Sequence, residues 1–582
     1  MAVLTIFSGD NEMRFNSKST LLSKMAAHVA TFAGAAALLG FPNLASATVD
    51  MKNANYTESW IDVQLAGSGY SLKVQRTYNS RSVFNGMFGF GWCSDFETNI
   101  EKTPEGTLKL QECGAGQEIT YRAQSASGDS VSKTIDAIVA YYKRTNPNSG
   151  DSSIATLREQ LLNNVSLRSR WARQASLKEP EITKGSVFVS DNLEVEKIEF
   201  DGIQYTRTLA DGSSQRFTKE GRLTALYDKN GNFLRFTYAG ELMKEAIDNS
   251  GKKLTFSFFP TKRVKDITGP GGIKVEYKYN GEDLQQVKNM WKNTYTYEYD
   301  DLHNLTKVTF PDDTFKALSY NQKNDWVTSF TDRAVAGVAC KESYEYNSNK
   351  QNPKDHFWST AVKKCGNEIK NEARFEFWLK TRSDGRKVLA RVLNRSMTDT
   401  LDVSYHPEYG RPTSIKRNSL TTSYDYYANG LVKEKSTSTT RLVFEYKNSF
   451  NKVSKVNTEF FDLKGKVAKK RETVFNYDSR GNLADAKNSD GQTVRLTYDQ
   501  RGRIASITDQ AKKEVQIKYE ERTGRPSQIT RPKVGTIAVT YKPNGEINKV
   551  ESNDGAAVAT QVASTFNNLL DIIAPATSEM NL

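Results

Sequence analysis

Residues 477–483 have the sequence YDSRGNL, and the pattern returns as YDQRGRI at residues 498–504. Two further copies begin at Tyr519 and Tyr541, so that successive copies lie 21, 21 and 22 residues apart. Apolar and polar residues alternate before each tyrosine, as in residues 494–498, which indicates a strand with one apolar face. The glycine after it supplies a positive φ for a turn, and the aspartate side chain caps that turn. Each copy therefore predicts a β-hairpin, and the fixed period predicts an array of hairpins that share a buried face.

The copies share an aromatic residue, an acidic or polar residue and a glycine at fixed spacing. The residues of this signature are Tyr477, Asp478, Gly481, Tyr498, Asp499, Gly502, Arg503, Tyr519, Gly524, Tyr541 and Gly545. A second run with a period of 20 or 21 residues extends from Phe217 to Tyr320, and the period resumes from Tyr405 to Tyr446. A tyrosine at this position can bury its ring while its hydroxyl reaches a hydrogen-bond partner. We therefore predict repeats over residues 183–550, of which residues 330–400 diverge from the pattern.

The pattern YDxxGR(L/I)xxxT resembles the YD repeat of Rhs proteins, of insecticidal toxin-complex subunits and of the extracellular part of teneurins. The resemblance covers roughly residues 190–550 and is strongest at residues 477–547. The segment RTYNS at residues 76–80, followed by GFGW at residues 89–92, is similar to the segment that commonly opens such arrays. The resemblance implies a continuous spiral β-sheet, which long members close into a hollow shell around a toxic C-terminal domain. We expect a mainly β fold whose hairpin array forms an open or partly closed spiral sheet, opened by a β region at residues 48–125.

Residues 1–47 have the three parts of a secretory signal peptide. Basic residues follow Met13, an apolar stretch extends from Met25 to Phe41, and the small residues Ala45 and Ala47 follow. Signal peptidase accepts this small-x-small pattern, so we predict cleavage after Ala47. Residues 1–12 are interpreted as an extension upstream of a start at Met13. The mature chain is expected to be secreted to the cell surface or the medium, with the periplasm as the alternative, and to have no membrane-spanning segment.

The four cysteines form two close pairs in the sequence. Cys93 and Cys113 are separated by 20 residues, and Cys340 and Cys365 by 25. In an oxidising compartment such spacings favour disulfides that clamp loops. A CxxC motif is absent from the sequence, which disfavours a zinc or redox site.

Two segments outside the repeats predict helices. Residues 126–182 predict a helical insert of two helices, the first at Ile135–Tyr142 and the second at Leu157–Trp171. A lid packed on the sheet is favoured over a docking device. Residues 551–582 predict a linker and a helix that caps the open edge of the array, with docking to a partner as the alternative.

Aromatic residues in the divergent stretch allow two interpretations. Phe375, Phe377 and Trp378 lie near one another in the sequence. Core strands are the favoured interpretation, and an exposed patch for stacking against glycans is the alternative.

No catalytic, cofactor or metal site is predicted. After removal of the signal peptide the histidines are His303, His356 and His406, and no HExxH, GxSxG or Walker pattern occurs. Asp355-His356 resembles half of a hydrolytic pair, but a surface histidine in a polar loop is the favoured interpretation. A glycan-active hydrolase is the least favoured alternative. The formal charge is +13, and because basic and acidic residues are interleaved, a solvated surface is favoured over a nucleic-acid partner.

Two functions agree with these features. The first is an exported, non-enzymatic binding or adhesion surface for glycans or cell-surface partners. The alternative is a structural half-shell of an Rhs-type toxin or delivery assembly, with a second Rhs-type chain as partner and the cargo on another chain. The residues after the repeats are expected to be too few for a catalytic effector domain.

Overall fold

The computed structural model describes residues 48–67, 69–112, 117–124, 130–190, 195–334, 337–382, 385–408, 410–542, 547–553 and 555–577. The predicted signal peptide with Ala45 and Ala47, and also Cys113 and Gly545, lie outside the described residues. The chain contains two compact units, which we call the larger unit (Asn43–Leu65 with Gly69–Glu472) and the smaller unit (chiefly Thr473–Leu582). The predicted mainly β fold with a hairpin array is confirmed.

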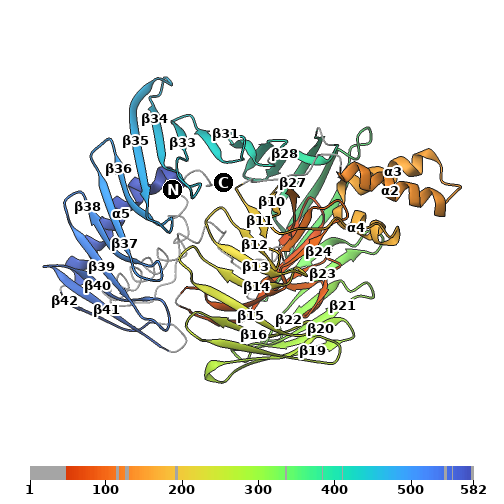
Figure 1. Ribbon diagram of the computed structural model, residues 1–582, viewed down its shortest axis with the longest axis horizontal. Coiled ribbons are helices and arrows are strands. Elements are labelled where there is room, and N and C mark those ends of the chain that lie inside the picture. Colours follow the sequence, from red (N-terminus) through yellow and green to blue (C-terminus); the bar gives the residue numbers. More distant parts are fainter. Residues whose placement is uncertain are drawn as a thin grey trace. The chain divides into compact units, whose positions relative to one another are not determined.

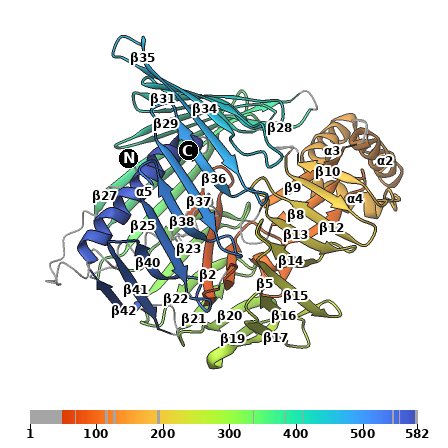
Figure 2. The same cartoon turned by 60° about the vertical axis from the view of Figure 1, so that its left-hand side comes forward.

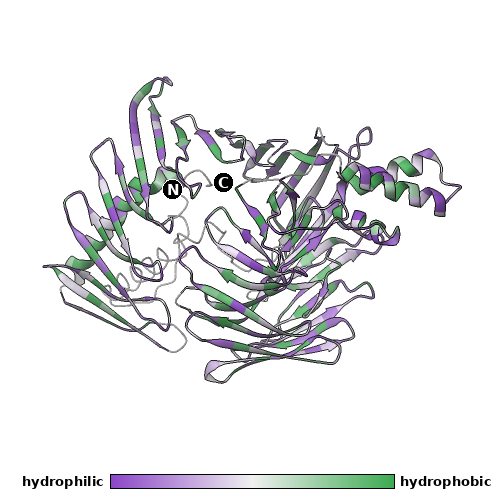
Figure 3. Cartoon of the chain, viewed as in Figure 1, coloured by the Kyte–Doolittle hydropathy of each residue, from purple (hydrophilic) through white to green (hydrophobic). Residues whose placement is uncertain are grey.

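The larger unit contains an antiparallel array in which successive strands pair (Figure 1). The array begins with β7 (Asn99–Lys102), β8 (Leu108–Glu112) and β9 (Gln117–Ala123), and it continues from β10 (Val187–Ser190) to β34 (Lys455–Phe461). Among the described residues no register joins β34 back to β7, and the array is not closed. Apolar and polar residues alternate along the strands, and this alternation gives the array one apolar face (Figure 3).

The hydrogen bonds that form a turn of the array join residues of the same repeat. Between β37 (Thr493–Tyr498) and β38 (Ile504–Asp509), Asp499 Oδ1 accepts hydrogen bonds from the backbone N–H groups of Arg501 and Arg503, both at 2.9 Å. Gly502 has a φ of 78°, which a residue with a Cβ adopts only at a cost. The register shifts between Thr497 and Tyr498, so a β-bulge precedes the turn.

A ladder of tyrosine hydroxyls joins successive hairpins. The hydroxyl of Tyr498 donates to the carbonyl of Leu483 at 2.8 Å, and that of Tyr519 donates to the carbonyl of Ile504 at 2.9 Å. The same bond recurs at Tyr541–Pro526, Tyr238–Leu223, Tyr299–Leu284 and Tyr320–Leu305. Each bond reaches back 15 residues, so the tyrosine predicted to bury its ring and use its hydroxyl links one repeat to the previous one.

A second sheet covers the apolar face of the array in the larger unit. This sheet, which we call the N-terminal sheet, contains β1 (Thr48–Asp50), β2 (Asn55–Leu65), β3 (Leu72–Asn79) and β6 (Trp92–Ser94). Its apolar residues and those of the array form one continuous core. Figures 1 and 2 show its red strands inside the curve of the yellow and green strands of the same unit.

The helical insert interrupts the connection between β9 and β10, which pair with each other. Its residues 130–182, which the structure describes, contain three helices, α2 (Ser130–Thr145), α3 (Asp151–Asn163) and α4 (Val165–Gln174), and the prediction of two was wrong. The predicted second helix is divided at Asn164, which has an extended backbone and accepts a hydrogen bond from the N–H of Leu167 to begin α4. The three helices share a small apolar core of their own.

The smaller unit contains an antiparallel array of its own, which ends with β42 (Ile547–Asn553) and is followed by α5 (Gly555–Thr577). This helix contacts β36 (Leu483–Asn488), β37, β38, β40 (Pro526–Arg531) and β41 (Gly535–Tyr541). Its buried side chains include Val558, Val562, Leu569 and Ile572. The prediction that α5 caps the edge of the array was wrong, because the helix crosses several strands and covers the face of this sheet. None of the helices in the described part of the chain is long and apolar enough to cross a membrane.

Candidate functional site

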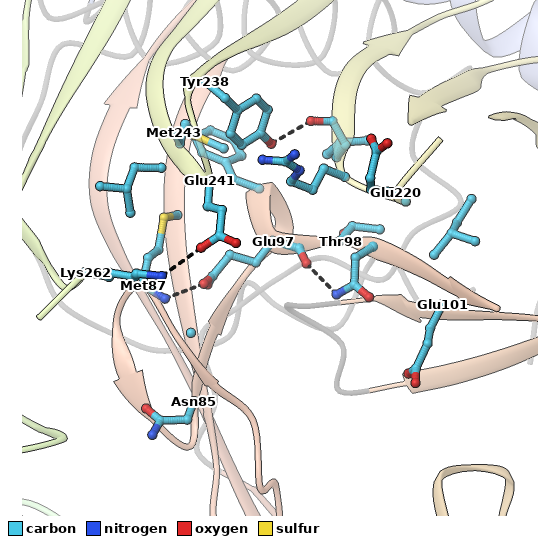
Figure 4. Close-up of a pocket in the computed structure, with 18 of the residues that line it drawn as sticks. Asn85, Met87, Glu97, Thr98, Glu101, Glu220, Tyr238, Glu241, Met243 and Lys262 are labelled. Atoms are coloured by element: carbon cyan, nitrogen blue, oxygen red, sulfur yellow. Dashed lines mark hydrogen bonds and ion pairs between the residues drawn. The ribbon is translucent and has the colours of Figure 1, made fainter. Parts of the chain in front are cut away.

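A cavity of about 920 Å³ lies within the larger unit, where turns of the array meet the segment that leads into β7 (Figure 4). Residues of three hairpins, at 219–223, 241–243 and 261–263, line it together with residues 85–87 and 96–102. Arg173 and Glu179 also line it. The N–H of Ile100 donates to the carbonyl of Gly221 at 2.9 Å, which fixes β7 against the first of these turns. The cavity therefore lies at the seam between the opening segment and the array.

Glu97 is an acidic group of the cavity wall, and burial raises its pKa. It ends the short helix η1 (Asp95–Glu97), and its carboxylate accepts from the N–H groups of Met87 at 2.6 Å and Ser94 at 3.1 Å. Burial raises the pKa of Glu97 to about 7, although these two hydrogen bonds act in the opposite direction. The group therefore changes charge near neutral pH.

Several other polar side chains of the cavity wall have partners within the protein. Lys262 pairs with Glu241 at 2.7 Å, as Figure 4 shows, and Arg222 donates to the carbonyl of Gly240 at 2.7 Å. Arg263 donates to the carbonyl of Gly86 at 2.5 Å and so joins a turn of the array to the opening segment. These contacts hold the turns of the array against one another and against the opening segment.

A buried ion pair anchors the N-terminal sheet. The guanidinium of Arg76 on β3 is fully buried, and it donates to the carboxylate of Asp62 on β2 at 2.5 and 3.0 Å. It also lies 4.5 Å from the ring centroid of Trp92. Tyr277 on β19 (Ile273–Asn280) donates to the same carboxylate at 2.7 Å, so the pair connects the N-terminal sheet to the array.

Further residues of the predicted opening segment reach the array. The hydroxyl of Tyr78 accepts from the N–H of Leu305 at 2.9 Å, and the indole N–H of Trp92 donates to the hydroxyl of Tyr299 at 2.9 Å. The resemblance identified these residues from their sequence, but their contacts lie more than 200 residues away and no local pattern indicates them.

The structure places the predicted cysteines as follows. Cys340 and Cys365 are joined by a disulfide between directly opposite residues of β25 (Cys340–Ser348) and β26 (His356–Cys365). Cys93 is also disulfide-bonded, but its predicted partner Cys113 lies outside the described residues.

The aromatic residues of the divergent stretch lie on both faces of β27 (Glu368–Thr381). Phe377 is buried and Phe375 packs against the core, in agreement with the favoured core interpretation. Trp378 lies on the other face, where His356 stacks on its ring at 4.9 Å and the guanidinium of Arg391 lies 4.8 Å from its centroid. The ring of Trp378 is therefore in contact with side chains of the protein itself.

The suggested pair Asp355-His356 is not formed in the structure. Asp355 pairs with Lys387 at 2.6 Å, whereas His356 Nε2 lies 2.7 Å from a carboxylate oxygen of Glu376. Across the described ranges, no group of three or more His, Cys, Asp or Glu side chains is placed to hold a metal ion.

Two family models match parts of the chain. Residues 46–121 match a domain of unknown function, DUF6531. Residues 394–531 match the teneurin YD-shell. The first match contains the N-terminal sheet, and the second lies within the predicted repeats.

The chain is similar to parts of longer proteins. The tRNA nuclease WapA of Bacillus subtilis strain 168 is 22% identical over 256 residues, which cover 39% of this chain and 11% of that protein. The tRNA3(Ser)-specific nuclease WapA of Bacillus spizizenii gives the same figures. The match thus spans about a tenth of the length of these curated relatives.

Solved structures of toxin complexes are also similar. The TcdB2–TccC3 complex without its hypervariable C-terminal region is 11% identical, with a TM-score of 0.36, and the match covers 92% of this chain and 32% of that one. The Tc holotoxin pore of Photorhabdus luminescens is 10% identical, with a TM-score of 0.26, and the match covers 84% and 30% of the two chains.

Proposed function

This chain is a YD-repeat protein of the Rhs type, and from this premise we propose that it forms part of the wall of an exported protein shell. More specifically, we propose that the chain is a structural subunit of an Rhs-type toxin or delivery assembly, whose cargo lies on another polypeptide. The observation that carries the proposal is the covering of the array. In the larger unit the N-terminal sheet covers its apolar face, and in the smaller unit α5 does so. A sheet covered by its own chain is a stable wall that needs no ligand to bury its apolar side chains.

The contacts within the array support a rigid wall. In the repeats that have the aspartate, its carboxylate caps a turn, and the tyrosine hydroxyl binds the previous repeat, as Asp499 and Tyr498 do. These bonds pair polar groups that would otherwise be buried without partners. The ion pair of Arg76 and Asp62 then holds the cover against the array.

Adhesion to glycans is the second candidate, and it receives less support from the same geometry. Sugars stack on accessible aromatic faces, but His356 and Arg391 lie against Trp378, and Arg374 lies 4.5 Å from the ring centroid of Trp358. A glycan would have to displace these side chains before it could stack.

The names of the WapA relatives describe nucleases acting on tRNA, but the matched stretch is about a tenth of each protein. We propose that the stretch shared with this chain is structural and that the chain does not cleave tRNA.

To test this proposal, the full chain is expressed in an oxidising compartment, and its mass in solution is measured by light scattering over a range of concentrations. The intact mass of the exported protein reports whether cleavage follows Ala47. The protein is also passed over immobilised neutral and acidic glycans and is incubated with bulk tRNA. We expect association at higher concentration, because an open array ends in strands with unpaired backbone groups, no retention by glycans and intact tRNA.

A strict monomer that one glycan retains would overturn the shell proposal in favour of adhesion. The variant Trp378→Ala would then show whether the divergent stretch is the glycan site, with Trp291→Ala, a half-exposed tryptophan in another turn, as the matched control. Cleavage of tRNA that persists after repurification would contradict the non-enzymatic assignment.

A further inference from the structure

A basic hairpin tip extends from the array between β34 and β35 (Val467–Tyr477). Residues 462–471, which we call the basic tip, have the sequence DLKGKVAKKR, with five cationic side chains and one carboxylate. Leu463 is 108% exposed and Val467 is 44% exposed, so two aliphatic side chains lie among these cations in solvent. Figure 2 shows this end of β35 extending beyond the neighbouring strands.

The turn itself fixes Leu463 at the outer corner. Asp462 Oδ1 accepts from the N–H groups of Lys464 at 2.8 Å and Lys466 at 2.9 Å, and the N–H of Gly465 donates to the carbonyl of Asp462 at 3.0 Å. Gly465 has a φ of 76° and completes the turn. The single carboxylate of the basic tip is thus directed at its own backbone, and the lysines face solvent.

The position of Leu463 differs from its equivalents in similar turns. The residue that follows the capping aspartate is Lys229 after Asp228, Ser479 after Asp478 and Gln500 after Asp499. These turns have the same hydrogen bonds, and the residue at this position is polar in each of them, exposed at Ser479 and Gln500 and half-buried at Lys229. The fold therefore does not require an apolar residue at this corner, and burial within the protein does not explain it.

We propose that the basic tip binds a membrane surface rich in anionic lipid. Lys464, Lys466 and their neighbours would contact the headgroups, and Leu463 and Val467 would enter the boundary between headgroups and acyl chains. Cationic side chains near such a surface are attracted by its negative potential, and exposed aliphatic groups gain by leaving water there. A nucleic acid would satisfy the cations but would give the two aliphatic side chains no apolar environment, so the membrane is favoured.

Lys470 pairs with Glu459 at 2.8 Å, but the lysine side chain is 72% exposed. Such a pair in water is weak, so it does not prevent Lys470 from approaching headgroups. The proposal is independent of the shell function, because it concerns a protruding turn and not the covered face of the array.

The test measures binding of the full chain to vesicles by sedimentation. Vesicles contain either equal parts of phosphatidylglycerol and phosphatidylcholine or phosphatidylcholine alone. We expect binding to the anionic vesicles that weakens with added salt, and little binding to the neutral ones. Replacing Lys464 and Lys466 by Gln should weaken binding roughly fivefold for each lysine, and Leu463→Ala should weaken it several-fold.

Matched controls separate the basic tip from the rest of the surface. Lys292→Gln with Lys323→Gln removes two exposed lysines from other turns, and Ile203→Ala removes a 79% exposed aliphatic side chain in a turn beside Asp201. These variants should bind as the unchanged chain does. Equal binding by the tip variants would overturn the proposal, as would binding of a DNA duplex, but not of anionic vesicles, that depends on Lys464 and Lys466.

Discussion

The hydroxyl of Tyr498 donates a 2.8 Å hydrogen bond to the carbonyl of Leu483, which lies 15 residues earlier in the preceding hairpin. We predict that Tyr498→Phe lowers the free energy of unfolding by about 1 kcal/mol, because the carbonyl loses its partner while the ring still packs. Burial also raises the pKa of Tyr498. Urea unfolding of the full chain measures the change, and hydrogen exchange locates it in the repeats.

Tyr141→Phe is the matched control for this bond, because Tyr141 lies on α2, outside the array, and its hydroxyl has no hydrogen-bond partner among the described residues. It should leave the unfolding curve unchanged. Equal effects of the two substitutions would show that the tyrosine ladder contributes nothing beyond ring packing.

The hairpin array was predictable because its determinants are local. The aspartate cap, the glycine with positive φ and the alternating strand lie within one repeat, as at Asp499 and Gly502, and neighbouring copies give the same prediction. The division of the helical insert was missed because a single residue, Asn164, ends one helix and begins the next without disturbing the apolar periodicity.

The covering of the array was not predictable, because it depends on contacts between distant segments. Tyr277 donates a hydrogen bond to Asp62, which lies 215 residues earlier in the chain. The repeat pattern predicts that one face of the sheet is apolar, but it does not predict that α5 covers this face. The cavity around Glu97 arises in the same way, from turns and an opening segment far apart in the sequence.

Substitutions at two glycines distinguish the destabilisation caused by a left-handed backbone from that caused by a steric clash. Gly221 has a φ of 87°, and a Cβ there would lie 1.8 Å from the carbonyl oxygen of Ile100, whereas Gly231 has a φ of 85° and no neighbour within 4 Å. We predict that Gly231→Ala costs ~1–2 kcal/mol from the left-handed backbone alone. Gly221→Ala should cost at least ~3 kcal/mol because β7 must move. Thermal unfolding compares the two, and equal losses would show that the seam at Ile100 adapts freely.

Substitutions in the buried ion pair of Arg76 and Asp62 test how much this pair stabilises the larger unit. Asp62→Asn leaves the fully buried guanidinium of Arg76 without a counter-charge, so we predict a loss of about 3–5 kcal/mol in the stability of the larger unit. Asp62→Leu combined with Arg76→Met removes both charges and should cost less. Because Arg76 lies against Trp92, tryptophan fluorescence during denaturation reports the transition. A double variant less stable than Asp62→Asn would contradict this account of the pair.

Because Glu97 is buried and its pKa is raised, we expect the free energy of unfolding to depend on pH. The pKa of Glu97 rises from 4.5 to about 7 on folding because its carboxyl is buried. Between these values the folded chain holds a proton that the unfolded chain has lost, so the free energy of unfolding falls as pH rises, by about 3 kcal/mol at most. We predict that Glu97→Gln reduces this slope, chiefly above pH 6, because burial also raises the pKa of Asp95 to about 6 and that group contributes a slope of the same sign at lower pH. Urea unfolding at several pH values measures the slope. Glu241→Gln, in the same wall but paired with Lys262, should leave the slope in place. An unchanged slope in Glu97→Gln would assign the pH dependence to another group.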